Sequence, residues 1–340
     1  MHYRTISDMN DVITANLHRL PSEIDLVVGV PRSGYLAANL LCLIKNIPMT
    51  DLDSFIDGRV HTSGITRRWA GLERTFSDFK NVLVIDDSIR SGASMRLVRE
   101  RISASGFQGN VMYSAVFGSR REHTETDFIF SAVPEPRVFQ WNVMHHSFLE
   151  SSCVDIDGVL CLDPTEAEND DGPAYEKFLL NAVPLHKPTR KIGSLVTSRL
   201  EKYRGLTEEW LGRQGIAYDN LIMLDLPSQA ERRRLGVHGS FKAEVYRASK
   251  ACLFIESERE QAEVIARMSG KPALCISTQE MFSPDNTSAA VLYQRVRSAP
   301  QKLEGLASRA RSGVFGVAKK VLGPTNYKKL RSKLLKSPGQ

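Results

Sequence analysis

The sequence predicts an α/β fold in which two parallel-sheet domains follow one another, with a basic helical tail after them. Strand-like apolar runs alternate with helical patterns in two successive series, which is typical of parallel sheets. Polar clusters follow the ends of these runs, where ligands of such sheets bind. The length of 340 residues is about twice the roughly 150 residues of an average domain.

The first series contains three apolar runs, at residues 24–30, 81–87 and 111–118, which we expect to be strands. Helical patterns at 35–44 and 93–103 follow the first two runs. This order predicts βα units of a parallel sheet.

The second series begins at residues 151–158, after an aromatic segment with two prolines. Its later strands are expected at residues 192–198, 220–226, 251–257 and 272–277. We therefore place a boundary near Phe148 and predict domains at 1–147 and 148–280, followed by the tail at 281–340.

Residues 82–95, VLVIDDSIRSGASM, combine a buried strand with two carboxylates at its tip, Asp86 and Asp87. The loop at 88–92 then opens a helix, so its backbone N–H groups form an anion nest at a helix N-terminus. This arrangement suits a sugar phosphate, because the acids bind hydroxyls and the nest binds phosphate. The alternative is an ordinary strand-to-helix turn with Asp as the N-cap.

This pattern resembles the binding motif for phosphoribosyl pyrophosphate (PRPP) in type I phosphoribosyltransferases, over about residues 20–120. The resemblance implies that Asp86 and Asp87 hold the 2- and 3-hydroxyls of ribose. It also implies that the 5-phosphate binds residues 88–94, and the site members there are Ser88, Arg90, Ser91, Gly92, Ala93 and Ser94. Ser91 stands where the family more commonly has Thr.

The turn GVPRSG at residues 29–34 stands where that family binds pyrophosphate, with Arg32 as the cation and Ser33 and Gly34 beside it. A rigid turn aims a guanidinium at phosphate oxygens. Residues 57–76 are rich in Gly and Arg and lack strand alternation, so they predict a surface loop. The resemblance implies that this loop closes over PRPP and that Arg67 and Arg68 neutralise the pyrophosphate.

Transfer from PRPP displaces magnesium pyrophosphate from C1 through a state that resembles an oxocarbenium ion. An acceptor hydroxyl benefits from a general base, and Asp51, Asp53 and Asp57 are the candidates that follow the first βα unit. The alternative is that these three are surface acids.

Residues 153–160, CVDIDGVL, place Asp155 and Asp157 on one side of a strand end, before a turn at Gly158. One carboxylate can attack phosphorus while the other moves a proton, and both can bind Mg²⁺. Further polar side chains follow later strand-like runs, namely Thr197, Ser198, Lys242, Glu256 and Glu258.

That order resembles the haloacid dehalogenase (HAD) phosphatase superfamily over about residues 150–280. The resemblance implies Asp155 as nucleophile and Asp157 as general acid and then base. It implies that Thr197, Ser198 and Lys242 bind the phosphoryl group, and that the Mg²⁺ ligands are Asp155, Asp157 and Glu256. The short spacing between Gly158 and Thr197 predicts a small cap. A non-catalytic scaffold is the alternative.

The fused order resembles PRPP-dependent ribofuranosyltransferases of bacterial surface-polysaccharide synthesis. This implies transfer of 5-phosphoribosyl to a glycan or lipid-linked glycan, followed by removal of the 5-phosphate, with Mg²⁺ as cofactor of both domains. Aromatic residues between the domains are candidates for acceptor stacking or for interdomain core, namely Phe139, Trp141, His145 and His146. Two other functions stay open: a nucleobase phosphoribosyltransferase fused to a nucleotidase, and a non-enzymatic PRPP sensor.

The net charge of +6 is concentrated in the tail, because residues 298–340 carry +9 and the remaining residues carry −3. Apolar residues recur there at helical spacing, and a basic amphipathic helix predicts binding to an anionic membrane surface. Docking onto the body and nucleic-acid binding are alternatives, although the tail has few aromatic residues for stacking. We expect a cytoplasmic protein, peripheral at the inner face of the cytoplasmic membrane, with no nucleic-acid partner.

Two other classes are excluded by pattern. No apolar run reaches the roughly 18 residues of a membrane-spanning helix, and the first residues lack the apolar core of a signal peptide. The five cysteines are scattered and form no C-x-x-C, so we expect reduced thiols and neither a disulfide framework nor a zinc site. The oligomeric state is not predicted.

Overall fold

The computed structural model describes residues 1–61 and 75–284. The chain forms two compact units, Met1–Val143 and Met144–Gln340. Both have a mixed α/β fold built on a mainly parallel sheet. The loop arginines Arg67 and Arg68 and the basic segment 298–340 lie outside the described residues.

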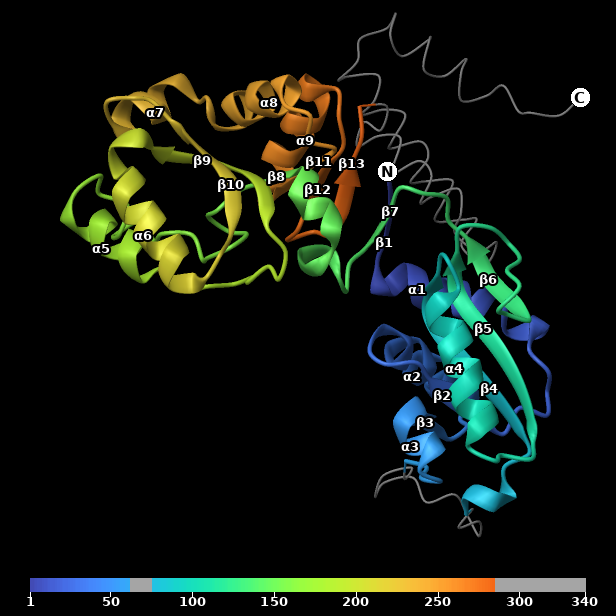
Figure 1. The fold of residues 1–340 in the computed structure, drawn as a ribbon. Helices are drawn as coiled ribbons and strands as arrows, with labels where there is room; N and C mark the ends of the chain where they lie inside the picture. The colour runs from blue at the N-terminus through green and yellow to red at the C-terminus, as the bar shows by residue number, and fades with distance from the viewer. Residues whose placement is uncertain (62–74, 285–340) are drawn as a thin grey trace, which may run out of the picture. The chain divides into compact units, whose positions relative to one another are not determined.

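The first unit contains a five-stranded sheet in the order β3-β2-β4-β5-β6, in which all neighbouring strands are parallel (Figure 1). Its strands are β2 (Leu26–Gly29), β3 (Met49–Asp51), β4 (Asn81–Ile89), β5 (Asn110–Gly118) and β6 (Phe128–Ala132). A separate parallel pair joins β1 (His2–Arg4) to β7 (Arg137–Phe139). The apolar run of β4 is buried, as expected for a strand covered on both faces.

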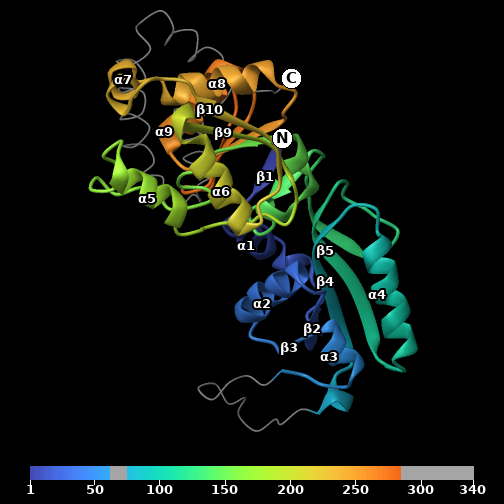
Figure 2. The ribbon, with the colours of Figure 1, turned by 60° about the vertical axis from the view of Figure 1, so that its left-hand side comes forward.

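Helices cover both faces of this sheet, and Figure 2 shows α2 and α4 on opposite sides of it. The helices are α1 (Ile6–Ala15), α2 (Ser33–Lys45), α3 (Leu52–Ile56) and α4 (Ala93–Ala104). Successive residues of β4 alternate between the two cores: Leu83 packs with α1 and α2, and Val84 packs with α3 and α4. The first unit is therefore a three-layer α/β/α structure.

The strand order changes direction between β2 and β4. From β2 the chain moves outward to β3, then returns to the other side of β2 to form β4, β5 and β6. Ligands of open α/β sheets bind at such a switch point, beyond the carboxyl ends of the strands. The turn at residues 29–34 follows β2, and the acidic pair Asp86 and Asp87 lies near the carboxyl end of β4.

Strand β4 is longer than the sequence indicates. It continues to Ile89, because Ser88 and Ile89 pair with Phe117 and Gly118 of β5. The expectation that the loop begins at Ser88 is therefore wrong, because Ser88 lies within β4. The loop between β4 and α4 consists of residues 90–92.

The second unit contains a six-stranded sheet in the order β10-β9-β8-β11-β12-β13. The strands are β8 (Ser152–Val154), β9 (Ile192–Leu200), β10 (Tyr218–Leu224), β11 (Leu253–Glu256), β12 (Ala273–Cys275) and β13 (Glu280–Phe282). All pairs are parallel except β12–β13, which is antiparallel and was not expected. The switch point of this sheet lies between β8 and β11.

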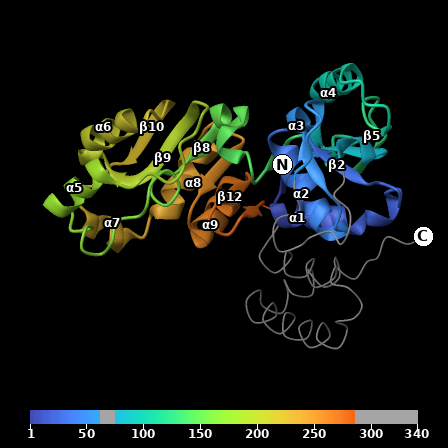
Figure 3. The same cartoon turned by 90° about the horizontal axis from the view of Figure 1, so that it is seen from below.

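Helices α8 (His238–Ala248) and α9 (Arg259–Ser269) pack against one face through Tyr246, Phe254 and Ile265. Figure 3 shows α6 (Arg204–Gln214) and α9 on opposite sides of the sheet. The connection from β8 to β9 contains helix α5 (Pro173–Asn181), which contacts α6. Helix α7 (Gln229–Leu235) precedes α8. Short 3₁₀ helices are η1 (Leu17–Arg19), η2 (Phe76–Asp78), η3 (Val143–His145), η4 (Ser147–Ser151) and η5 (Glu201–Tyr203).

Two further properties follow from the described residues. None of their helices combines the length and the apolar character needed to cross a lipid bilayer. The cysteines are free thiols, as the sequence predicts, and the buried ones are Cys42, Cys153, Cys161 and Cys275.

Candidate functional site

The first candidate site is centred on the acidic pair of β4. The backbone N–H of Asp87 donates a hydrogen bond to Asp86 Oδ1 at 2.8 Å. Burial raises the pKa of Asp86 well above its usual value, and the charge of Asp87 raises it further. Burial also raises the pKa of Asp87, although its hydrogen bonds with Asp86 and Trp141 oppose that shift. These two carboxyls therefore share negative charge near the carboxyl end of the central strand β4.

Trp141 fixes one member of this pair. Its indole Nε1 donates a hydrogen bond to Asp87 Oδ2 at 2.7 Å. The indole stacks on Phe139, with ring centroids 4.8 Å apart and planes 12° apart, and Phe139 stacks on Phe117. The stack holds the indole in one orientation and thereby holds the carboxylate of Asp87.

This arrangement changes the interpretation of the four aromatic residues considered for acceptor stacking. Phe139 belongs to the core of the first unit, and Trp141 is bound to Asp87. In the second unit, His145 Nδ1 lies 3.1 Å from Thr189 Oγ1, and His146 caps η4. For Phe139 and Trp141 the structure favours core packing and support of Asp87.

The turn after β2 packs directly against the acidic pair. Gly34 has no room for a side chain, because an added Cβ would lie 2.7 Å from the Ile85 carbonyl oxygen and 3.0 Å from Asp86 Oδ1. The Val30 N–H also donates to the Ile85 carbonyl at 3.0 Å. Arg32 is exposed at the N-cap of α2, with Ser33 as the first helical residue. The two motifs predicted from the sequence are thus neighbours at the switch point.

The conformation of the loop predicted to bind the 5-phosphate depends on Gly92. This residue has φ of +76° and is the N-cap of α4. An added Cβ would lie 2.2 Å from His123 Cε1, so no other residue fits without a shift of His123. Arg90, Ser91, Ala93 and Ser94 are exposed around it. The first N–H groups of a helix attract an anion. The N-terminus of α4 follows β4, the strand that carries Asp86 and Asp87, after a loop of three residues.

The three candidates for a general base have other partners. Asp51 is the N-cap of α3 and accepts a hydrogen bond from the Ser54 N–H at 2.9 Å. Asp53 forms an exposed ion pair with Arg101 at 2.7 Å, and Asp57 forms one with Arg59 at 2.7 Å. Asp53 and Asp57 are thus exposed surface acids, whereas the side chain of Asp51 is only 25% exposed.

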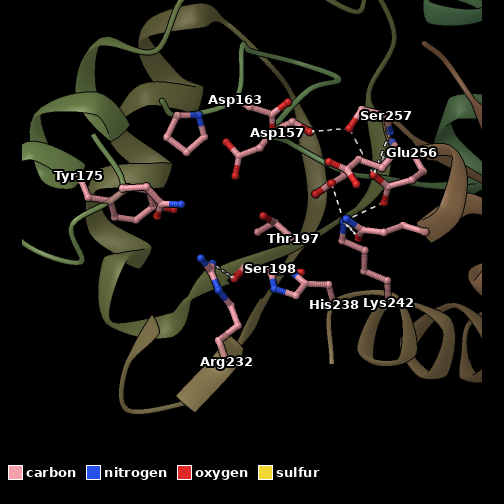
Figure 4. A pocket seen from close by; sticks show the side chains of 15 residues that line it. Asp157, Asp163, Tyr175, Thr197, Ser198, Arg232, His238, Lys242, Glu256 and Ser257 are labelled. Carbon is pink, nitrogen blue, oxygen red and sulfur yellow. Dashed lines mark hydrogen bonds and ion pairs between the residues drawn. The ribbon is translucent and has the colours of Figure 1, made fainter. Parts of the chain in front are cut away.

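The second candidate site is a pocket of about 350 Å³ in the second unit, shown in Figure 4. At its base Lys242 Nζ lies 2.6 Å from Asp155 Oδ2 and 2.8 Å from Glu256 Oε2. All three side chains are buried. They come from the end of β8, from α8 and from the end of β11, and so meet at the switch point.

Burial raises the pKa of Asp155, and the ammonium group of Lys242 opposes that shift. Burial by itself would lower the pKa of Lys242, but the charges of Asp155 and Glu256 raise it. The lysine therefore stays protonated. Its positive charge offsets negative charge of the two carboxylates buried beside it.

Asp157 is held by Arg199, which the sequence reasoning did not single out. Arg199 Nη2 donates to Asp157 Oδ1 at 2.6 Å, and Nε donates to Oδ2 at 3.1 Å. The Arg199 guanidinium is fully buried, whereas the side chain of Asp157 is 19% exposed. A bidentate pair of this kind fixes both the position and the orientation of the carboxylate.

Thr197 and Ser198 also line this pocket. Thr197 Oγ1 accepts a hydrogen bond from the Arg199 N–H at 3.2 Å. Gly158 has φ of +72°, and an added Cβ would lie 2.3 Å from Ser257 Oγ, so this turn packs against the end of β11. Residues that line the pocket without having been predicted include Asp163, Asn169, Tyr175, Arg232, His238 and Gln261.

The three residues predicted to bind Mg²⁺ are each paired with a cationic side chain in the arrangement observed. Lys242 takes one oxygen of Asp155 and one of Glu256, and Arg199 binds both oxygens of Asp157. The second oxygen of Glu256 accepts the Ser257 N–H at 2.9 Å. Within residues 1–61 and 75–284, no group of three His, Cys, Asp or Glu side chains is arranged to hold a metal ion.

Comparisons with protein-family models and with curated proteins find no match. Solved structures similar to part of the chain include a purine phosphoribosyltransferase from Pyrococcus horikoshii, with 20% identity, a TM-score of 0.30, and coverage of 41% of this chain and 92% of that one. Another is the xanthine-guanine-hypoxanthine phosphoribosyltransferase of Helicobacter pylori, with 14% identity, a TM-score of 0.28, and coverage of 42% and 92%.

A third similar structure is a hypoxanthine-guanine phosphoribosyltransferase from Bacillus anthracis, with 14% identity, a TM-score of 0.24, and coverage of 38% of this chain and 79% of that one. Similarity at these scores identifies neither the fold family nor the activity of this chain.

Proposed function

We propose that the chain transfers a 5-phosphoribosyl group from PRPP to an acceptor in its first unit and hydrolyses the resulting phosphate monoester in its second. The net product is an acceptor that carries a ribofuranosyl group. The observation that carries this proposal is the position of the two acidic motifs. Asp86–Asp87 and Asp155–Asp157 both lie at the switch point of their sheets, where ligands of such folds bind.

In the first unit, the site supports binding of a ribose phosphate. The carboxyls of Asp86 and Asp87 accept hydrogen bonds from the ring hydroxyls. The N–H groups that begin α4 bind the 5-phosphate, and Arg32 neutralises the pyrophosphate as the C1–O bond breaks. The magnesium ion that accompanies pyrophosphate belongs to the substrate.

In the second unit, the site supports a covalent phosphatase mechanism. An oxygen of Asp155 attacks phosphorus, the bond between phosphorus and the sugar oxygen breaks, and Asp157 donates a proton to that oxygen. Water then attacks the aspartyl-phosphate while Asp157 takes a proton from it, which releases phosphate and restores Asp155. Lys242 offsets the negative charge that the phosphoryl group adds.

Arg199 has a defined part in this cycle. Its paired hydrogen bonds hold the Asp157 carboxylate in one orientation, next to the place where it gives a proton to the leaving oxygen and takes one from water.

We propose a glycan hydroxyl as the acceptor, on the resemblance of the fused order to ribofuranosyltransferases of polysaccharide synthesis. The basic segment 298–340 supports a location at an anionic membrane surface, where lipid-linked glycans are presented. Truncation after Ala299 is expected to weaken binding to anionic vesicles and to leave activity on a water-soluble acceptor unchanged. Unchanged vesicle binding would contradict the membrane location.

The test is the identification of products by mass spectrometry after incubation with PRPP, Mg²⁺ and a panel of glycan and nucleobase acceptors. We expect a ribosylated glycan, pyrophosphate and inorganic phosphate. The double variant D86N/D87N should release no pyrophosphate, and D11N, an exposed substitution on α1, serves as the matched control. A nucleoside product would identify a nucleobase as the acceptor and contradict the glycan. Normal pyrophosphate release by D86N/D87N would contradict the transferase assignment.

A further inference from the structure

Arg232 on α7 is a buried cation that the proposed chemistry does not use. It is 9% exposed and lines the phosphatase pocket. Its Nη1 donates to the Ser198 carbonyl oxygen at 2.7 Å, and the Tyr175 hydroxyl also interacts with it. The Nε atom is buried and has no hydrogen-bond partner. In the part of the chain that the structure describes, Arg232 forms no ion pair with a carboxylate, in contrast to Lys242 and Arg199.

A second unpartnered atom lies beside it. Ser198 Oγ is buried in the same pocket and makes no hydrogen bond. Figure 4 shows Ser198, Arg232 and His238 next to one another on the wall opposite Asp157 and Asp163. Buried polar atoms without partners reduce stability unless a ligand or water satisfies them. Two such atoms on one pocket wall indicate a binding site.

This wall is distinct from the place of the transferred phosphoryl group. The phosphoryl group must lie within bonding distance of Asp155, next to Lys242. Figure 4 shows the guanidinium group of Arg232 and the ammonium group of Lys242 at different parts of the pocket wall, with His238 between them.

The side chains on this part of the pocket wall favour a negatively charged ligand. With Nη1 bound to the Ser198 carbonyl, the edge formed by Nε and Nη2 is the one that binds carboxylate or phosphate oxygens in pairs. Burial together with the charges of Arg232 and Lys242 lowers the pKa of His238, so this neighbour is a neutral donor. A buried guanidinium without a carboxylate partner favours a negatively charged ligand.

We propose that Arg232 and Ser198 bind a second anionic group, a carboxylate or a phosphate, carried by the leaving group of the phosphatase substrate. This inference rests on the proposed phosphatase function and narrows its substrate. The preferred substrate is a ribosyl 5-phosphate attached to an acidic acceptor, and a neutral ribosyl 5-phosphate binds more weakly.

The experiment measures binding to the non-hydrolysing variant D155N by titration calorimetry. Three ligands are compared: methyl ribofuranoside 5-phosphate as the neutral reference, carboxymethyl ribofuranoside 5-phosphate as the carboxylate, and ribose 1,5-bisphosphate as the phosphate. Each is repeated with R232Q added. The matched control is R233Q, which makes the same change at an exposed position of the same helix.

We expect at least one of the two doubly anionic ligands to bind at least about tenfold more tightly than the methyl glycoside, and the better of them identifies the anion. R232Q should remove that preference and change the affinity for the methyl glycoside by no more than about twofold. R233Q should change neither the preference nor that affinity. Equal weakening of all three ligands by R232Q would overturn the inference, because Arg232 would then bind the transferred phosphoryl group. The absence of any preference in D155N would also overturn it.

The outcome separates this inference from the proposed function. One outcome is that binding favours the doubly anionic ligands and depends on Arg232, but the native chain hydrolyses none of the ligands. That outcome would contradict the phosphatase activity and would still support the anion site. Failure of all three ligands to bind D155N would overturn both. A melting curve for R232Q that matches that of R233Q establishes that the variant is folded.

Discussion

The indole Nε1 of Trp141 lies 2.7 Å from Asp87 Oδ2, although the two residues are 54 positions apart in the chain. This bond ties a residue near the end of the first unit to the acidic pair at its switch point. The aromatic stack beneath the indole fixes its position, so Asp87 has one orientation before any ligand binds. Preorganisation of this kind reduces the cost of binding the ribose hydroxyls.

Replacement of Trp141 by Phe keeps most of the stacking and removes the donor. We expect W141F to lower kcat/KM for PRPP by about ten- to a hundredfold, because a hydrogen bond to a charged group contributes about 1.5 to 3 kcal/mol. The measurement is the rate of pyrophosphate release. Phosphatase activity of the same variant is the internal control and should be unchanged. Pyrophosphate release at the native rate would contradict the role given to Trp141.

Gly92 and Gly106 form a matched pair for a test of the phosphate loop. Both have positive φ, +76° and +77°, but an added Cβ would strike His123 at Gly92 and meet nothing within 4 Å at Gly106. Each Ala substitution should cost about 1 to 2 kcal/mol of stability from backbone strain. G92A should in addition weaken PRPP binding at least about tenfold, because the loop must shift away from His123. Equal PRPP affinities of G92A and G106A would exclude this role of the loop.

Lys242 is expected to support both stability and hydrolysis. K242Q leaves Asp155 and Glu256 buried without a counter-charge, which should lower the free energy of unfolding by about 3 to 5 kcal/mol and abolish phosphate release. The control K191Q removes an ion pair with Asp219 in which both side chains are about half exposed, so stability should change little. Chemical denaturation and phosphate release are the two measurements. A K242Q variant that releases phosphate at the native rate would contradict the assignment of Lys242.

Arg199 offers a test that separates positioning from charge. R199K keeps a positive charge next to Asp157 but loses the paired hydrogen bonds, so the carboxylate is less well oriented. We expect kcat for dephosphorylation to fall by about ten- to a hundredfold with KM little changed. An unaltered kcat would show that Arg199 is purely structural.

Much of the fold follows from local sequence pattern. Apolar runs that are buried on both faces, such as residues 82–85, predict the central strands, and each run expected to be a strand overlaps one in the structure. The acidic pairs stand at the ends of two such runs, and the topology brings them to the switch points. The ends of the elements do not follow from local pattern: β4 reaches Ile89 because β5 pairs with it there.

The residues that sequence reasoning missed have partners far along the chain. Arg199 contacts Asp157 from 42 positions away, and Arg232 contacts Ser198 from 34 positions away. Arginine and tryptophan are common on surfaces and in cores, so their types alone do not indicate such contacts. The cationic partners of the predicted magnesium ligands, Arg199 and Lys242, also come from distant elements. The three-residue strands β1, β7 and β13 are too short to show a period.

The most direct test of sequential transfer and hydrolysis is the mass of the product made by D155N from PRPP, Mg²⁺ and the acceptor. The substitution keeps the shape of Asp155 and removes the nucleophile of the second unit. The account predicts that pyrophosphate is released as in the native chain and that the product accumulates with its 5-phosphate, heavier than the native product by one phosphoryl group. A phosphate-free product from D155N, formed at the native rate, would contradict it.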